Sequence, residues 1–427
     1  MKKPVIILVC VLFMIAFVSP TIAESANPKY EAKSLELVAT VLDSPSEAPL
    51  IHVWVHGDYA YVGGHNPGYY TSPPADIGVR ILDISNPEKP VLVARIPLGE
   101  GGWRGPNPAE PHLCGDAVVT HLETDAFVGD VAAVLNGVPV GTSVSNTGNP
   151  IGIWDVTDPK NPQFLSHVEF GWIAHNDYYV RQTSIGGTLL SASFGAGEDT
   201  VLGDLMISDV GIADLSDPRN PVIQAIWNDA ETNPFITNVR ANTEGTRLYI
   251  SGVAPYPYST TAEYGLLYIL DTTDPTEPTE IGKYTYDLVG VPSEPLAVPH
   301  EHKDLVVVSD GSWGDGRWGY LHIIDISDLS NIREISTFKI PESNQPGWPE
   351  SWPLCLQLEV QGDLVYSTWF DGGMYVVDIS DPVQPIEVAN FVLTEPEQWM
   401  LGVYPKGDLI LAAQIWDAGL HILRLIP

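Results

Sequence analysis

A twelve-residue pattern recurs along the chain, and this repetition restricts the possible folds more than any other feature. Each copy is a short apolar run that ends in an aspartate and is followed by a polar turn with two prolines, as in M-Y-V-V-D-I-S-D-P-V-Q-P at Met374 to Pro385. The repeated aspartates are Asp83, Asp155, Asp214, Asp271, Asp325 and Asp378, and an incomplete seventh copy has Arg424 in this place. Successive copies lie 46 to 72 residues apart. Repeats of this size predict a propeller or a solenoid rather than independent domains.

The composition of each repeat indicates strands. Apolar and β-branched residues dominate, 38 glycines and 37 prolines interrupt them, and no stretch keeps an apolar period of 3.6 residues. The chain is therefore predicted to be all-β, with four antiparallel strands in each repeat. The Asp-Pro-x-x-Pro segment suits a turn, and each repeated aspartate is expected to accept hydrogen bonds from nearby backbone N–H groups.

The repeated unit resembles the LVIVD repeat, a β-propeller repeat of bacterial and archaeal, often exported, proteins. The resemblance covers almost all of the chain after residue 23 and implies a propeller fold, but it implies no single activity. The C-terminal copy stops after its third strand, whereas Ser34 to Leu42 precedes the first repeat and has no blade of its own. Pairing these two segments removes an exposed sheet edge. We therefore expect one domain, residues 34–427: a seven-bladed β-propeller of four-stranded antiparallel blades, its last blade closed by the N-terminal strand.

The N-terminal residues are typical of a secretory signal peptide. Lys2 and Lys3 precede an apolar run from Val5 to Val18, and small residues follow up to Ala23. We expect a signal peptide at residues 1–23, a linker at 24–33, and a secreted, periplasmic or cell-surface location. No other stretch is apolar enough to span a membrane. Cys114 and Cys355 are expected to be separate buried thiols, because they belong to blades far apart around the ring.

The charge of the chain limits its partners. With 20 basic and 54 acidic residues, the formal net charge is −34. Such a surface repels phosphate backbones and anionic lipids, so nucleic acid is not an expected partner. A protein or carbohydrate partner outside the cytoplasm is expected instead, and the protein is expected to be a monomer.

Variation in loop length is concentrated on one face of the predicted propeller. The turns from first to second strand and from third to fourth strand are short and uniform, whereas the connections at the other face vary in length and contain aromatic residues. Variable loops on a rigid scaffold are where binding residues tend to lie. The candidate ligand-binding residues on this face are Trp103, Trp172, Trp313, Trp318, Trp352 and Trp399.

Acidic residues recur just before the innermost strands, which surround the central channel. A ring of carboxylates there is a candidate divalent-cation site, with Ca²⁺ as the expected ion. The alternative is that each glutamate caps the backbone of its own loop. The candidate metal ligands are Glu47, Glu110, His175, Glu294, Glu350 and Glu397. In the loop that begins at Asp310, two acids and several glycines are compatible with either a Ca²⁺ loop or a simple hairpin.

Histidines near the innermost strands form a second candidate metal set for a transition metal such as Cu or Zn. Its members are His112, His175, His300 and His302. These residues form no H-x-x-x-H pair and the sequence contains no C-x-x-C pair that would support this set, and histidines that are hydrogen-bonded in a structural role explain the residues equally well.

The function that the sequence favours is an exported binding or scaffold module that recognises its ligand through the variable face. The alternative is a metal-dependent enzyme on the same fold, either a hydrolase or lactonase or a copper oxidase resembling the selenium-binding-protein-like propellers. Nucleophile elbows, zincin helices and phosphate loops are not found in the sequence, so no motif favours catalysis.

Overall fold

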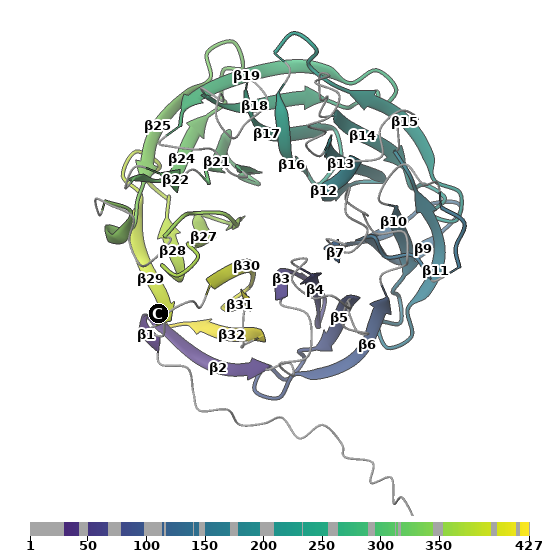
Figure 1. The fold of residues 1–427 in the computed structure, drawn as a ribbon, viewed down its shortest axis with the longest axis horizontal. Coiled ribbons are helices and arrows are strands. Elements are labelled where there is room, and N and C mark those ends of the chain that lie inside the picture. The colour runs from purple at the N-terminus through teal and green to yellow at the C-terminus, as the bar shows by residue number, and fades with distance from the viewer. Residues whose placement is uncertain are drawn as a thin grey trace, which may run out of the picture.

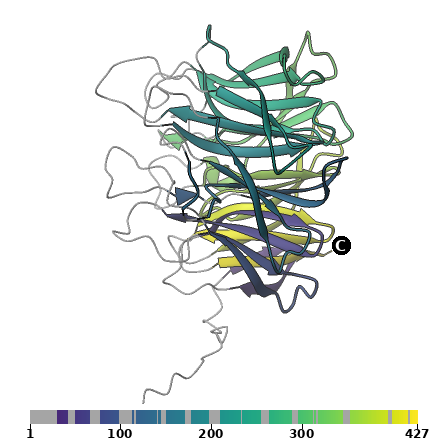
Figure 2. The same cartoon turned by 90° about the vertical axis from the view of Figure 1, so that its right-hand side faces the viewer.

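Seven antiparallel sheets surround one axis in the computed structural model, each sheet forming one blade of a ring (Figure 1). The structure describes residues 30–41, 50–66, 78–97, 113–114, 117–139, 141–144, 150–170, 178–196, 209–232, 234–254, 264–288, 295–311, 313–314, 317–344, 353–393, 399–415 and 419–426. The predicted fold class, a seven-bladed all-β propeller, is confirmed. Seen edge-on, the ring is a thick disc (Figure 2).

The strands of the first four blades follow one another along the chain, from the innermost strand to the outermost. Blade one contains β3 (Leu50–His56), β4 (Tyr59–Asn66), β5 (Gly78–Asp83) and β6 (Val91–Pro97), and the short β7 (Leu113–Cys114) pairs with the end of β4. Blade two contains β8 (Ala117–Glu123), β9 (Val128–Leu135), β10 (Ile151–Asp155) and β11 (Gln163–Val168). Blade three contains β12 (Tyr178–Gly186), β13 (Leu189–Ala196), β14 (Asp209–Asp214) and β15 (Val222–Trp227). Blade four contains β16 (Phe235–Ala241), β17 (Arg247–Ala254), β18 (Tyr264–Asp271) and β19 (Thr279–Asp287).

The last three blades carry additions to this plan. Blade five contains β20 (Leu296–Pro299), β21 (Leu305–Ser309), β24 (Leu321–Asp325) and β25 (Arg333–Phe338), with a hairpin of β22 (Trp313–Gly314) and β23 (Arg317–Trp318) between its second and third strands. The 3₁₀ helix η1 (Pro341–Asn344) follows this blade. Blade six contains β26 (Leu358–Gln361), β27 (Leu364–Thr368), β28 (Met374–Asp378) and β29 (Ile386–Leu393). Blade seven contains β30 (Trp399–Lys406), β31 (Leu409–Ile415) and β32 (Gly419–Leu425).

The N-terminal segment closes the ring as predicted and also extends the neighbouring blade. Strand β2 (Leu35–Val41) pairs antiparallel with β32 and becomes the outer strand of blade seven. Strand β1 (Tyr30–Lys33) pairs with β29 and adds a fifth strand to blade six. Four residues of the stretch expected to be a linker are therefore part of a sheet. Figure 1 shows β1 and β2 lying against two successive blades.

The repeated aspartates have the structural role predicted for them. In all six copies, one carboxylate oxygen of the aspartate accepts the backbone N–H of the residue two positions later, at 2.7–3.1 Å. A second Asp or Asn, three residues after the first, makes the same turn again. In blade five, Asp325 accepts hydrogen bonds from Ser327 and from the Arg333 guanidinium. The bonds with Ser327, followed by the one with Arg333, lower the pKa of Asp325 to about 2. The incomplete copy replaces the carboxylate with Arg424, which pairs with Glu36 and Asp408.

The two faces of the ring are built differently. The six connections between the third and outer strands that carry the motif are all seven residues long: 84–90, 156–162, 215–221, 272–278, 326–332 and 379–385. On the opposite face the connections range from three residues (416–418) to nineteen (339–357). One face therefore has a fixed geometry and the other does not.

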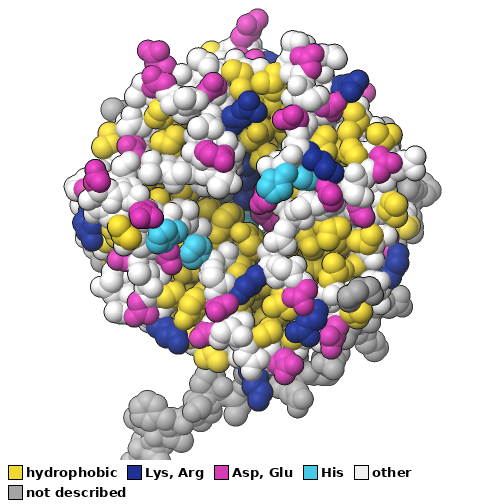
Figure 3. All heavy atoms as spheres, turned by 180° about the vertical axis from the view of Figure 1, so that it is seen from behind, with side chains coloured by type: hydrophobic (Ala, Val, Ile, Leu, Met, Phe, Trp, Pro, Cys, Tyr) yellow, Lys and Arg dark blue, Asp and Glu magenta, His cyan; other side chains and the backbone are white. Residues whose placement is uncertain are grey.

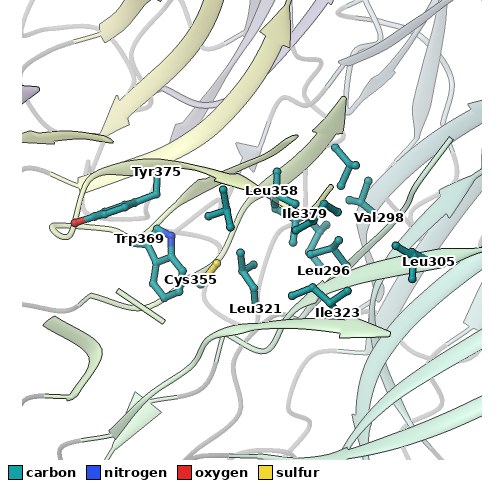
Figure 4. Close-up of a cluster of buried hydrophobic side chains, with 14 of the residues drawn as sticks. Leu296, Val298, Leu305, Leu321, Ile323, Cys355, Leu358, Trp369, Tyr375 and Ile379 are labelled. Atoms are coloured by element: carbon teal, nitrogen blue, oxygen red, sulfur yellow. The ribbon is translucent and has the colours of Figure 1, made fainter. Parts of the chain in front are cut away.

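Apolar side chains fill the spaces between neighbouring blades. Between blades five and six, Leu321 and Ile323 pack with Leu358, Trp369 and their neighbours (Figure 4). Cys355 lies within this cluster as a free, fully buried thiol, as predicted. Burial raises its pKa well above the ordinary value, so the thiol is protonated and unreactive. The side chain of Cys114 lies outside the described residues.

Candidate functional site

The residues predicted to form the acidic ring lie outside the described part of the chain. This applies to Glu47, Glu110, His175, Glu294, Glu350 and Glu397. The same holds for Trp103, Trp172 and Trp352 of the predicted ligand-binding set and for His112 of the second metal set. The cation site at the channel mouth therefore stays a prediction.

Three predicted tryptophans can be placed. Trp313 and Trp318 are paired opposite each other in the β22–β23 hairpin, although their side chains lie outside the described part. Trp399 begins β30 and is only partly exposed, since its ring lies 5.1 Å from that of Phe370. Phe370 follows β27 and has a positive φ of 47°, a conformation that a bulky residue rarely adopts. Trp399 thus bridges blades six and seven.

Two predicted histidines lie in the turn after β20, on the face of short turns. His300 is buried, and its Nδ1 accepts the backbone N–H groups of His302 and Lys303. Its Nε2 donates to Asp363 of blade six at 3.3 Å. Both ring nitrogens of His300 are therefore engaged in holding the turn. His302 is exposed and lies 3.8 Å from Glu301.

Ion pairs between blades recur on this face of short turns. Lys406 pairs with Asp58 at 2.8 Å, which joins blade seven to blade one, and Lys303 pairs with Asp363 at 2.5 Å. Asp130 of blade two accepts a hydrogen bond from His121 Nδ1 at 2.7 Å and lies 3.3 Å from Nε2 of His56 in blade one. Figure 3 shows this face, where acidic and basic side chains are interspersed around a central hollow. Cross-blade contacts therefore tie neighbouring blades together on this face.

A charged pair crosses the central channel. Arg240 of β16 donates from Nη2 to Glu359 Oε1 of β26 at 2.5 Å, although blades four and six are not neighbours. Both side chains are largely buried, at 13% and 16% exposure. The guanidinium also lies 5.8 Å from the ring centre of Trp54 in blade one. Side chains from three non-adjacent blades therefore meet on the axis.

Aromatic residues surround this pair. The Trp54 indole donates to the backbone oxygen of Val119 in blade two at 3.0 Å, and its ring packs against Tyr404 of blade seven at 4.9 Å. Burial, followed by the Glu359 carboxylate, raises the pKa of Tyr404 well above its usual value, so the phenol keeps its proton. The channel at this level is thus narrow and partly apolar, with Arg240 as a basic group on its axis.

A small cavity of about 20 Å³ adjoins the charged pair. Six blades line it, through His52, Val53, Trp54, Val118, Thr183, Arg240, Gln357, Glu359, Gly402 and Val403. Thr183 is 2% exposed, and neither its hydroxyl nor Arg240 Nε has a hydrogen-bond partner among the described residues. Sequence reasoning missed this site, because its residues come from strands that are distant in the chain and share no motif.

A second polar cluster, also missed, is buried in blade five. His322 of β24 is 1% exposed, with Nδ1 2.5 Å from Glu334 and Nε2 3.4 Å from the fully buried Asp310. The rings of Tyr286 and Tyr320 lie 4.5 and 4.6 Å from the imidazole. Burial alone would lower the pKa of His322, but the two carboxylates outweigh it and raise this pKa above its ordinary value. The two carboxylates therefore favour the charged imidazole over the neutral one.

The position of His322 in the repeat is a signal that the sequence did contain. In four blades, the residue three positions before the repeated aspartate, or before Arg424 in blade seven, faces an aromatic ring from the preceding blade: Gly211 meets Phe170, Tyr268 meets Trp227, His322 meets Tyr286 and His421 meets Phe391. A polar residue at this place in an apolar strand needs buried partners. Histidines at this position therefore indicate a buried polar cluster between blades.

Asp310 also bears on the loop that the sequence marked as a candidate Ca²⁺ loop. One of its carboxylate oxygens accepts the backbone N–H of Tyr320 and the other faces His322. The loop between Asp310 and Tyr320 contains the β22–β23 hairpin. The described residues therefore support a hairpin rather than a Ca²⁺ loop. Asp315 lies outside them.

The described residues hold neither a metal-binding cluster nor a membrane-spanning helix. No group of three or more His, Cys, Asp or Glu side chains in the described ranges is arranged to hold a metal ion. Within the same ranges, no helix has the length and apolar character needed to cross a bilayer.

Comparisons with known proteins agree with the fold. The family model described as LVIVD repeat matches residues 51–69, 75–96, 316–339 and 356–392. Among curated proteins, none matches the sequence. A chain of the crystallised mitotic checkpoint complex is similar at 10% identity and a TM-score of 0.52, over 92% of this chain and 95% of that one.

The β-propeller domain of Cps50 (Swd1) from Myceliophteria thermophila is similar at 12% identity and a TM-score of 0.52, over 91% of this chain and 99% of that domain. At such identities the likeness concerns the fold alone. The match to the repeat model, the six capped aspartates and the closed ring of seven blades together show that the chain is a seven-bladed β-propeller that contains LVIVD repeats.

Proposed function

We propose that this propeller is an exported binding scaffold, whose face of variable loops recognises a protein or carbohydrate partner. The observation that carries the proposal is the difference between the two faces. On the face of short turns, six connections have the same length of seven residues, and ion pairs join neighbouring blades. On the other face the connections range from three to nineteen residues. A rigid frame that supports unequal loops is the usual arrangement of a binding protein.

The narrow central channel also favours a partner that binds on a face of the ring. Arg240, Glu359 and Trp54 meet on the axis, so the channel narrows to a small cavity at their level. A large partner would therefore dock on a face of the ring rather than pass through it. The similar propellers of the checkpoint complex and of Cps50 support the fold but do not identify a partner.

Site-specific photo-cross-linking in the producing cell tests which face binds. A photo-reactive amino acid replaces Ser143 or Ala230, which are exposed in connections of the variable face. Matched control variants carry it at Val128 and Val383, which are 68% and 60% exposed on the other face. We expect a discrete cross-linked product from Ser143 or Ala230 and none from the controls. Products that form only from Val128 or Val383 would contradict the proposed face.

The metal-dependent enzyme predicted as the alternative depends on residues outside the described part, and it remains a prediction. Metal analysis of the purified mature protein separates the two functions. Copper or zinc at one equivalent would favour the enzyme, whereas calcium or no metal would agree with a binding scaffold.

A further inference from the structure

The cavity in the central channel has the chemistry of a ligand site that is separate from the variable face. It is enclosed by six blades and lies beside the pair formed by Arg240 and Glu359. Its volume of about 20 Å³ exceeds what one water requires. Figure 3 shows that the ring is hollowed at the centre of the face of short turns, which gives the axis access to solvent.

Two of its polar groups have no hydrogen-bond partner among the described residues. The Thr183 hydroxyl can donate or accept, and Arg240 Nε can only donate. Thr183 is 2% exposed, so its hydroxyl is buried at the wall of the cavity. Because buried polar groups are nearly always hydrogen-bonded, each of these groups calls for a partner that the cavity can hold, and for Arg240 Nε that partner must be an acceptor.

The charges around the cavity restrict the group that supplies this oxygen. Glu359 neutralises Arg240, so an added anion would meet a carboxylate in a chain of net charge −34, and an added cation would meet the guanidinium. A neutral hydroxyl avoids both conflicts. It can accept from Arg240 Nε and donate to the oxygen of Gln357 or Glu359, both of which line the cavity.

We infer that the channel cavity binds a hydroxyl group of a neutral polyol or carbohydrate, held by Arg240 and Thr183. The apolar wall of Trp54, Val118 and Val403 suits the carbon next to that hydroxyl. Because a cavity of about 20 Å³ holds about one water-sized group, it takes one hydroxyl of the ligand and leaves the rest in the channel. The site does not depend on the variable face or on the partner proposed for it.

Saturation-transfer NMR on the mature protein tests the inference with four probes: glycerol, D-glucose, sodium acetate and tetramethylammonium chloride. We expect saturable binding of glycerol and glucose and no binding of the two ions. Thr183→Val keeps the shape of the side chain but removes the hydroxyl, and it should weaken binding about tenfold. Arg240→Lys keeps a charge opposite Glu359 but removes the Nε donor, and it should weaken binding similarly.

The matched control is Ser191→Ala. Ser191 is also a fully buried hydroxyl of blade three without a hydrogen-bond partner among the described residues, but it does not line the cavity. Its replacement should leave binding unchanged. Three results would overturn the inference: binding of acetate in place of the neutral probes, no binding of any probe, or full binding by the Thr183→Val variant. The result in which no probe binds would mean that the cavity is a site for water only.

Discussion

The contacts of His322 with Asp310 and Glu334 lead to a direct prediction for the variant Asp310→Asn. The asparagine can still accept the N–H of Tyr320, but it can no longer carry the negative charge that faces His322. Removing one partner of a buried charged group costs about 3–5 kcal/mol when no other partner remains. Here Glu334 remains, so the expected loss in the free energy of unfolding is about 2–3 kcal/mol.

The same variant should change how stability depends on pH. The folded-state pKa of His322 is raised, so its stabilisation is complete below the unfolded pKa of about 6.5 and is lost as the pH rises through the folded pKa. Groups that face the imidazole from neighbouring elements are Asp310, Glu334, Tyr286 and Tyr320. Without the charge of Asp310 the pKa of His322 falls, and the decrease in stability above pH 6.5 should become smaller.

Urea unfolding followed by fluorescence at pH 6 and pH 8 measures both effects, and NMR of the histidine ring protons reports the pKa directly. The matched control is Asp408→Asn, since Asp408 is 68% exposed and pairs with Arg424 at 3.4 Å. An exposed pair of this kind contributes about 0–1 kcal/mol. The reasoning is refuted if Asp310→Asn costs no more than Asp408→Asn, or if the difference between pH 6 and pH 8 is the same as in the wild type.

Four further predictions follow from described contacts. Replacing Gly265 with Ala places a Cβ 2.1 Å from the ring of Tyr286, so the urea midpoint should fall by an amount equivalent to about 1–3 kcal/mol. Burial lowers the pKa of His421 to about 4. The free energy of unfolding should therefore decrease by about 3 kcal/mol as the pH falls from about 6.5 to 4. In the His421→Gln variant this decrease should be smaller. Cys355 should resist thiol reagents in the native protein and react after unfolding in urea, and a fast native reaction would contradict its burial. Removing residues 24–41 should lower the thermal midpoint far more than removing 24–33, because the larger deletion exposes the edge of β32; equal effects would contradict the closure.

The ring could be predicted from the sequence because each repeat contains the same local hydrogen-bonded turn. In all seven blades, the backbone N–H of the residue after the aspartate position donates to a backbone oxygen in or just after the turn between the first two strands, as Ile84 does to Asp58 and Leu425 does to Asp408. This bond needs no aspartate, so the copy with Arg424 folds like the others. Strand β1 was missed because four mostly polar residues, Y-E-A-K, carry no apolar alternation.

The channel site could not be predicted in the same way. Arg240 and Glu359 are 119 residues apart and come from blades that are not adjacent, so only the diameter and register of the closed ring bring them together. No periodic pattern encodes such a contact. The cluster around His322 was closer to prediction, because the histidine stands out in an apolar strand. Its partners are Asp310, which follows β21, and Glu334, which lies in β25, and both look like ordinary surface acids in the sequence.

The position of β1 and β2 has a consequence for the order of events during synthesis. These strands precede the other strands of the chain, yet they pair with β29 and β32, which are synthesised after most of the ring. Blades six and seven therefore cannot be completed until residues 386–393 and 419–425 have been synthesised. A nascent chain with its first five blades assembled still has an open ring.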